Sequence, residues 1–293
     1  MANLESHRLG IDDVMYEDHK QVQETFRITL LGTGSPRPTL ERHHPATLVT
    51  WGKGGHMLVD AGDGVVGQLL AAGVSLREVH NVALTHMHWD HILGYPAFVW
   101  GSWNMGRLKL TVTGPLGTRD MHHRLVESYY REQAEWAIDL GFPRAGFDDI
   151  TVRDVSVGWS EEIDACVVEA GPVYHPPMHA LAFRFTYQGR TLAVTGDTAM
   201  CDELIAFCRG VDVLVIDACA ISPADDLPPA RKRIIERLHE FHASPQDCID
   251  IATQAKVGKV VLTHHLPGAK PEFDASDFAG RVVIGQDLDV IEI

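Results

Sequence analysis

The sequence predicts an α/β fold in which two mixed β-sheets pack face to face and helices cover their outer surfaces. Short β-rich segments bounded by turn residues recur along the chain, and segments with helical spacing of apolar residues lie between them. The strands also fall into two groups, within residues 26–113 and 150–293, each with its own helices. Two sheets with helices outside satisfy both observations in one domain, an αββα sandwich.

The composition is that of a globular chain with an ample core. Hydrophobic residues make up 45% and charged residues 22% of the 293 residues. A chain of this length fits one large α/β domain, so length alone does not require two. We place that domain at residues 26–293, after a polar and aperiodic N-terminal arm at residues 1–25.

Strands and helices alternate in the first half of the predicted domain. A glycine-rich turn at residues 52–55 predicts a hairpin, and Gly73 ends the first helix. Helical spacing over residues 118–140 stops at Gly141, so residues 115–149 are expected to form a helical cap segment. The strands are expected at 26–32, 46–51, 56–62, 79–86 and 107–114, and the first helix at 64–73.

The second half repeats the alternation. Residues 211–218 form a continuous apolar run, which is typical of a strand covered on both faces. Gln188-Gly189 is a tight turn between two of the strands. The strands are expected at 150–154, 163–170, 180–187, 190–196, 211–218, 259–264, 281–286 and 289–293, and the helices at 200–209, 228–240 and 245–256.

Charge and cysteine usage narrow the function classes. The formal net charge of −15 repels phosphate backbones and argues against a nucleic-acid partner. The five cysteines are odd in number and form no CxxC pair, as expected for free thiols in a reducing compartment. The N-terminus lacks the features of a signal peptide, and no apolar run reaches the roughly 18 residues of a membrane span. We therefore expect a cytoplasmic protein without a membrane segment.

Histidine is the compositional outlier, with 17 residues, and several lie in one motif. His86-Met87-His88-Trp89-Asp90-His91 is a HxHxDH pattern at the carboxyl end of a predicted strand. Because residues at i and i+2 of an extended segment point to one side, His86 and His88 can bind one metal ion together. Asp90 and His91 follow where the strand turns, so they can face a second ion. Imidazole and carboxylate ligands suit zinc, and also manganese or iron.

Further ligand-type residues follow other predicted strands. Asp197 ends Val194-Thr195-Gly196, while His175 and His264 follow two more strand-like segments. Carboxyl ends of strands are where open α/β sheets gather ligands. Asp60 also ends a strand, and we interpret it as a group that fixes a loop or a ligand rather than as a ligand itself.

The HxHxDH motif, an isolated downstream histidine, the Gly196-Asp197-Thr198 triplet and the Leu262-Thr263-His264 triplet together resemble the metallo-β-lactamase superfamily. The opening Leu31-Gly32-Thr33-Gly34-Ser35-Pro36 and the last two triplets are similar to the branch that holds ribonuclease Z-type tRNA 3′-processing enzymes, arylsulfatases and related phosphodiesterases. The resemblance covers roughly residues 26–266.

The resemblance implies a dinuclear site with two zinc ions. His175 is preferred to His179 because the family's histidine precedes a short strand with an arginine, and His264 is preferred to His265 by the form of the motif. Asp197 bridges the ions. The implied ligands are His86, His88 and His175 for the first ion and Asp90, His91 and His264 for the second.

The implied mechanism is hydrolysis by a hydroxide that bridges the two ions, with Asp90 accepting a hydrogen bond from it. His242 falls where the tRNA-processing branch carries a histidine that can act as a general acid. The resemblance expects a carboxylate three residues before it, but His239 stands there, which leaves open how His242 is tuned.

The substrate expected from the sequence is a small organic molecule of aryl or ester type. The tRNA-processing enzymes carry a protruding basic arm, and no such insertion is present; aromatic residues at 89, 98, 100, 103 and 136 can wall an apolar pocket instead. The alternatives are a phosphodiesterase or tRNA 3′-processing nuclease, a lactonase or β-lactamase-like enzyme, and a hydrolytic dehalogenase. A di-iron redox protein and a metal-stabilised binding protein fit the residues less well. The oligomeric state stays open, with a homodimer as one candidate.

Overall fold

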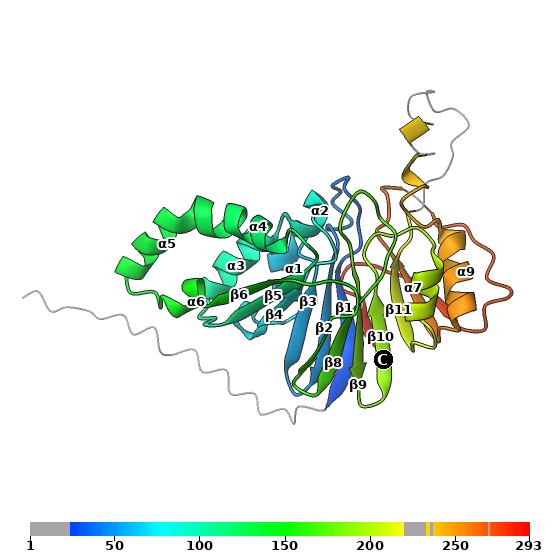
Figure 1. The fold of residues 1–293 in the computed structure, drawn as a ribbon, viewed down its shortest axis with the longest axis horizontal. Helices are drawn as coiled ribbons and strands as arrows, with labels where there is room; N and C mark the ends of the chain where they lie inside the picture. Colours follow the sequence, from blue (N-terminus) through cyan, green and yellow to red (C-terminus); the bar gives the residue numbers. More distant parts are fainter. Residues whose placement is uncertain (1–23, 220–232, 235–236, 269) are drawn as a thin grey trace, which may run out of the picture.

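The computed structural model describes residues 24–219, 233–234, 237–268 and 270–293. Nearly all of the expected arm at residues 1–25, and most of the expected helix at 228–240, lie outside these residues. The described chain forms two seven-stranded sheets with helices on their outer sides (Figure 1). The predicted αββα sandwich is therefore confirmed.

The first sheet has the order β14-β1-β2-β3-β4-β5-β6, and its strands from β3 to β6 run parallel. The β2–β3 hairpin lies where the glycine-rich turn predicted it. The strands are β1 (Thr25–Gly32), β2 (Ala46–Gly52), β3 (Gly55–Val59), β4 (Asn81–Ala83), β5 (Leu110–Gly114), β6 (Ile150–Asp154) and β14 (Val290–Glu292).

The second sheet has the order β13-β12-β11-β10-β9-β8-β7, and its strands from β10 to β13 run parallel. The strands are β7 (Ser160–Ile163), β8 (Cys166–Gly171), β9 (Ala182–Tyr187), β10 (Arg190–Val194), β11 (Val213–Asp217), β12 (Lys259–Thr263) and β13 (Arg281–Ile284). The single strand expected over 163–170 is thus a β7–β8 hairpin.

Two strands lie in a different sheet from the one their place in the sequence suggested. β6 pairs with β5, and the C-terminal β14 pairs with β1, so both complete the first sheet. Grouping by sequence was wrong for them because an alternating pattern shows which face of a strand is buried and not which strand lies beside it.

Three apolar clusters fill the spaces between the four layers. The inner faces of the sheets meet around residues such as Ile28, Phe183 and Val261, all fully buried. A second cluster packs α1 (Val65–Ala71) and α3 (Tyr95–Asn104) against the first sheet, and a third packs α7 (Asp202–Phe207) and α9 (Pro245–Ala255) against the second. Ser244 caps α9 by accepting a hydrogen bond from the Asp247 amide, so this helix starts where the sequence predicted it.

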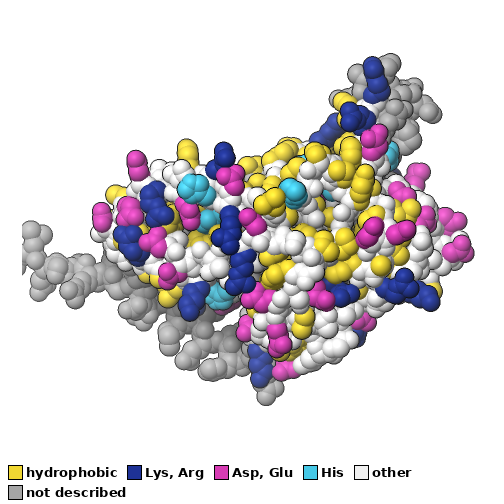
Figure 2. All heavy atoms as spheres, in the orientation of Figure 1, with side chains coloured by type: hydrophobic (Ala, Val, Ile, Leu, Met, Phe, Trp, Pro, Cys, Tyr) yellow, Lys and Arg dark blue, Asp and Glu magenta, His cyan; other side chains and the backbone are white. Residues whose placement is uncertain are grey.

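The helix expected over 118–140 is present in three parts: α4 (Thr118–His122), a π-helical segment η2 (His123–Ser128) and α5 (Tyr129–Asp139). In Figure 1, α4 lies near α2, and α5 extends away from the sheets. Figure 2 shows charges of both signs over the helical segment and hydrophobic side chains gathered over the middle of this face. The sequence did not predict the longer helix α3. It also did not predict three short elements: η1 (Leu76–Glu78), α2 (Trp89–Ile92) and α6 (Ala145–Asp148). A cap function for residues 115–149 stays a prediction.

The carboxyl ends of five strands meet at one edge of the sandwich, because β3 and β4 run parallel in one sheet and β10, β11 and β12 run parallel in the other. Parallel strands bring the residues that follow them together. These residues are Asp60 after β3, His86 after β4, Asp197 after β10, Asp217 at the end of β11 and His264 after β12.

His122, at the end of α4, predicts a pH dependence of stability. It is buried, its Nδ1 accepts a hydrogen bond of 2.7 Å from the Tyr95 hydroxyl, and burial lowers its pKa from 6.5 to about 4. Between pH 6.5 and pH 4, His122 is therefore protonated in the unfolded chain but neutral in the folded chain. We therefore expect the free energy of unfolding to fall by up to about 3 kcal/mol as the pH is lowered from 6.5 to 4.

Chemical denaturation at several pH values checks this expectation. His122→Asn keeps an acceptor for Tyr95 and should flatten the pH dependence between 6.5 and 4, whereas His123→Asn, at an exposed neighbour, should not. An unchanged slope in His122→Asn would contradict the assignment.

Candidate metal centre

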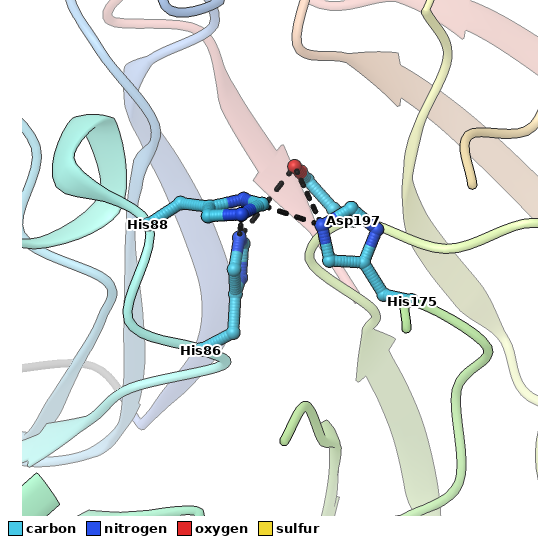
Figure 3. A group of neighbouring side chains, drawn as sticks. All are labelled: His86, His88, His175 and Asp197. Atoms are coloured by element: carbon cyan, nitrogen blue, oxygen red, sulfur yellow. Dashed lines mark hydrogen bonds and ion pairs between the residues drawn. The ribbon is translucent and has the colours of Figure 1, made fainter. Parts of the chain in front are cut away.

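Four side chains form a first cluster of ligand-type atoms: His86, His88, His175 and Asp197, with one such atom from each lying within 4.8 Å of the others (Figure 3). Nδ1 of His88 lies 2.9 Å from Nε2 of His86 and 3.2 Å from Nε2 of His175. Nδ1 of His88 carries either one proton or one lone pair, so it cannot fully satisfy both neighbouring nitrogens, whereas a cation between the rings would accept a lone pair from all three. The donor set is the one zinc takes in proteins.

Asp90, His91 and His264 form a second cluster on the other side of Asp197. Nε2 of His264 lies 3.4 Å from Oδ2 of Asp90. Oδ1 of Asp197 lies 3.2 Å from Nε2 of His91 and 3.4 Å from Nε2 of His264.

Asp197 occupies a bridging position between the two clusters. Its Oδ1 faces the second cluster, while its Oδ2 faces the first, 3.6 Å from Nε2 of His86 and 3.8 Å from Nε2 of His175. Burial opposes ionisation, but the neighbouring imidazoles, His264 foremost, hold the pKa of the Asp197 carboxyl well below its usual range. This carboxylate is therefore placed to contact two cations.

The burial of these atoms tests whether metal ions fit. Oδ2 of Asp90, Nε2 of His91, Oδ1 of Asp197 and Nε2 of His264 are buried and make no hydrogen bond to any residue that the structure describes. An unsatisfied buried polar atom costs about 1–3 kcal/mol, so four in one place would be strongly destabilising. Divalent ions would satisfy all four, and the residues therefore fit a dinuclear metal site.

Asp60 supports the centre from behind without contributing to either cluster. It accepts hydrogen bonds from the Thr85 amide at 2.7 Å, the Thr85 hydroxyl at 2.8 Å and Nδ1 of His91 at 2.8 Å. The Nδ1 proton of His91 is thereby held on the carboxylate side, so the lone pair of Nε2 faces the centre. Nδ1 of His175 donates in the same way to the Phe241 carbonyl at 2.9 Å. These contacts agree with the supporting role that the sequence suggested for Asp60.

His242 lies beside the second cluster and pairs with a carboxylate that was not predicted. Its Nδ1 lies 2.7 Å from Oδ2 of Asp217, and Oδ1 of the same carboxylate lies 3.2 Å from Nδ1 of His264. Burial opposes protonation of His242, but Asp217 outweighs it and raises the pKa of the imidazole. Asp217 therefore orients both a ligand-type histidine and a candidate proton donor.

The resemblance expects a carboxylate three residues before His242, where His239 stands, but the carboxylate that pairs with His242 is Asp217 at the end of β11. One signal in the sequence could have found it. Asp217 ends an apolar strand, as Asp60 and Asp197 do, and the same strand-end rule applies to it. Asp217, with Asp197, His242 and His264, also forms a group of ligand-type atoms, but its Oδ2 is already paired with His242.

Of the alternative ligands, the structure places His175 and His264 at the centre and not His179 or His265. His179 is exposed and lines a hollow beside the site. His265 is buried, its Nε2 donates to the Leu262 carbonyl at 2.9 Å, and burial lowers its pKa to about 4.

An αββα sandwich with clustered histidines and aspartates at its strand ends defines a metal-dependent hydrolase fold. A family model described as "Beta-lactamase superfamily domain" matches residues 56–265. "Ribonuclease Z" of Mycobacterium bovis (strain BCG / Pasteur 1173P2) is 30% identical over 286 residues, which cover 92% of this chain and 98% of the relative. "Ribonuclease Z" of Mycobacterium sp. (strain KMS) is 32% identical, with 92% and 96% covered. The chain belongs to the metallo-β-lactamase superfamily, in its ribonuclease Z-like branch.

Solved structures agree on the fold. The short form of human tRNase Z superposes with a TM-score of 0.68 at 21% identity, covering 91% of this chain and 99% of that one. The metallo-β-lactamase fold protein YhfI from Bacillus subtilis superposes with a TM-score of 0.69 at 19% identity, covering 92% and 100%.

None of the described helices is long and apolar enough to cross a membrane. The cytoplasmic location and the homodimer stay predictions.

Proposed function

We propose that the protein is a dinuclear metal phosphodiesterase that cleaves RNA, with a tRNA precursor as its substrate. The observation that carries this proposal is the His242–Asp217 pair, placed beside the bridging Asp197 with Nδ1 of His242 3.8 Å from Oδ2 of Asp197. The relatives named ribonuclease Z support the nuclease that was the alternative in the sequence analysis. Nothing in them supports an arylsulfatase or an esterase.

The proton donor favours a phosphodiester of ribose over an aryl ester. A ribose oxygen is a poor leaving group and needs a proton as its bond to phosphorus breaks, whereas a phenolate leaves without one. Because Asp217 holds Nδ1 of His242, the proton available for transfer is the one on Nε2. A protein that hydrolysed activated aryl esters alone would gain little from this pair.

Two metal ions bound by the seven ligand residues would supply a nucleophile from water and polarise a phosphate oxygen. In this proposal Asp90 would also orient the nucleophile, since it lies in the second cluster with its Oδ2 3.4 Å from Nε2 of His264. Zinc is the metal we propose, from the imidazole and carboxylate donor set.

The net charge of −15 is unfavourable for binding RNA, but a basic hollow lies beside the metal centre. Arg37, Arg42 and Lys270 line a space of about 200 Å³ next to His265, with Glu41 as the one acidic residue among its lining. On the helical segment, in contrast, arginines are paired with carboxylates, as in the 2.7 Å contact of Arg144 with Glu135. Arg42 is held by hydrogen bonds to Thr33 and to the Gly285 carbonyl, so Arg37 and Lys270 are the cations that we expect to meet phosphates.

The test is cleavage of a tRNA precursor with a 3′ trailer by the metal-loaded protein, beside p-nitrophenyl sulfate and p-nitrophenyl acetate. The expected result is one cut at the tRNA–trailer junction and kcat/KM for RNA far above that for either aryl compound. No RNA cleavage together with efficient hydrolysis of an aryl compound would overturn the proposal and restore the small-substrate interpretation.

Salt dependence checks the basic hollow. Arg37→Ala and Lys270→Ala should each raise KM for the precursor several-fold at about 0.15 M salt, leave kcat unchanged and lower the slope of log(kcat/KM) against log salt by about 1. Lys53→Ala is the matched control, because Lys53 is exposed in the β2–β3 turn, at the opposite end of β3 from Asp60. Equal slopes in all three variants would show that the hollow meets no phosphate.

A further inference from the structure

A second hollow, of about 430 Å³, adjoins the metal centre and has no role in the chemistry described above. Its walls are mainly apolar and include three methionines. We call it the methionine hollow and define it by Met87, Met121, Met178, Leu116, Leu125 and Pro177.

The loops that build the methionine hollow also carry the imidazoles of the first cluster. Met87 stands between His86 and His88 in the sequence, and Pro177 and Met178 follow His175 closely. The remaining wall comes from Ile92 in α2, from α4 and the residues just before it, and from the π-helical segment η2. A group bound in the hollow is thus within reach of a phosphate held at the first cluster.

Most of the wall of the hollow lies in the half of the molecule that does not carry the proton donor. His242 follows β11 in the half of the molecule with α7 and α9, whereas α4 and η2 belong to the other half (Figure 1). Of the lining residues, only Pro177, Met178 and His179 come from the half that carries His242; they follow His175, whose ring lies 5.0 Å from that of His242. The leaving group must meet His242, so the hollow faces the part of the substrate that keeps the phosphate.

The lining fits a flat aromatic ring and offers few hydrogen-bonding groups to the edge of that ring. Thioether sulfurs make favourable contacts with aromatic rings, and flexible methionine side chains adapt to rings of different size. Arg124 and Asp120 at the rim bond one another, with Nε of Arg124 2.9 and 2.8 Å from the two carboxylate oxygens. These contacts engage Nε of Arg124 and both carboxylate oxygens of Asp120, and His179 is the one other lining residue with a polar side chain. Apolar side chains form most of the walls, so the hollow should recognise a ring rather than a particular base.

We propose that the methionine hollow binds the base of the nucleotide that keeps the scissile phosphate, without selecting among bases. This proposal rests on the proposed function, since it names the subsite that a nucleic-acid substrate occupies. The occupant follows from three observations: the apolar walls, the loops shared with the first cluster, and a wall built mainly by the half of the molecule that does not carry His242.

The test compares two diesters with the same leaving group. Uridine 5′-(p-nitrophenyl phosphate) carries a base and methyl p-nitrophenyl phosphate does not. We expect the nucleoside diester to have the higher kcat/KM by about 30-fold or more, and the adenosine analogue to match the uridine one within about 3-fold. Leu116→Ala combined with Leu125→Ala should lower this advantage by about 10-fold, mainly through KM, and leave the methyl diester unchanged.

Two further variants make the result specific. Leu116→Trp should fill the hollow and lower hydrolysis of the nucleoside diester alone. Leu140→Ala is the matched control, since Leu140 is also an exposed leucine of the helical segment and does not line the hollow. Leu116 and Leu140 are 61% and 62% exposed, so neither change should prevent folding.

Binding gives a readout that does not depend on turnover. Uridine 5′-monophosphate should bind the metal-loaded protein more tightly than ribose 5-phosphate, and the double leucine variant should remove the difference. Equal binding, or equal loss for both diesters in the variants, would overturn the subsite while phosphodiester hydrolysis stands. Hydrolysis of neither diester, with tight nucleotide binding retained, would overturn the proposed function and leave the subsite supported.

Discussion

Asp197→Asn is expected to lower kcat for phosphodiester hydrolysis by about 10³-fold or more and to reduce the metal content below two ions per chain. The physical reason is that both carboxylate oxygens of Asp197 are placed for use, Oδ1 toward His91 and His264 and Oδ2 toward His86 and His175. An amide has one acceptor oxygen and no charge, so it cannot bridge two cations or offset the clustered imidazoles.

The measurement combines elemental analysis of the purified protein with kcat on methyl p-nitrophenyl phosphate. Asp202→Asn is the matched control, because Asp202 is an exposed acid in the first turn of α7, five residues further along the chain. Two ions per chain and wild-type turnover in Asp197→Asn would refute the bridging assignment. Chelation should also lower the Tm of the wild-type protein, since ions that bind only the folded chain stabilise it.

His242→Ala is expected to separate substrates by their leaving groups. On an RNA substrate, whose leaving oxygen is ribose-like, kcat should fall by about 10²–10³-fold, because the proton donor is lost. On p-nitrophenyl diesters kcat should fall less than about 10-fold, because p-nitrophenolate needs no proton to leave. Asp217→Asn should show the same split with a smaller loss on RNA, since an amide oxygen still accepts from Nδ1 of His242 but carries no charge.

Metal content and a neighbouring histidine control this experiment. Asp217 also lies 3.2 Å from Nδ1 of His264, so the metal content of Asp217→Asn must be measured to separate loss of an ion from loss of proton transfer. His239→Ala is the matched control, being an exposed histidine three residues before His242. Equal losses on RNA and on p-nitrophenyl diesters in His242→Ala would assign His242 a role in holding the site and not in donating a proton.

The proposed RNA substrate differs from the small organic substrate that composition suggested. Net charge is a sum over the whole chain, whereas binding depends on charge near the site, and Arg37, Arg42 and Lys270 gather there. The aromatic residues that were expected to wall a pocket do not line the hollow beside the centre. Phe98 and Trp103 are buried in the core, Trp136 is 66% exposed, and methionine and leucine line the hollow beside the centre.

What the sequence determined by itself was local. The HxHxDH motif places four ligand-type residues within six positions, so the backbone of one strand end and the turn after it brings them together. Strand ends carrying Asp197 and His264 could be read in the same way, because alternation and turn residues mark where each strand stops. The αββα class followed from the order of these elements.

Only the tertiary structure decided which distant residues meet. Asp217 and His242 are 25 positions apart and lie 2.7 Å apart, and nothing in their local sequence encodes that distance. β6 and β14 join the first sheet for the same reason, since pairing depends on which strand lies alongside. The methionine hollow likewise exists only where the loops after β4 and after His175 pack against α4. Local pattern sets how each segment buries its own side chains, but contacts between segments are set by the packing of the whole chain.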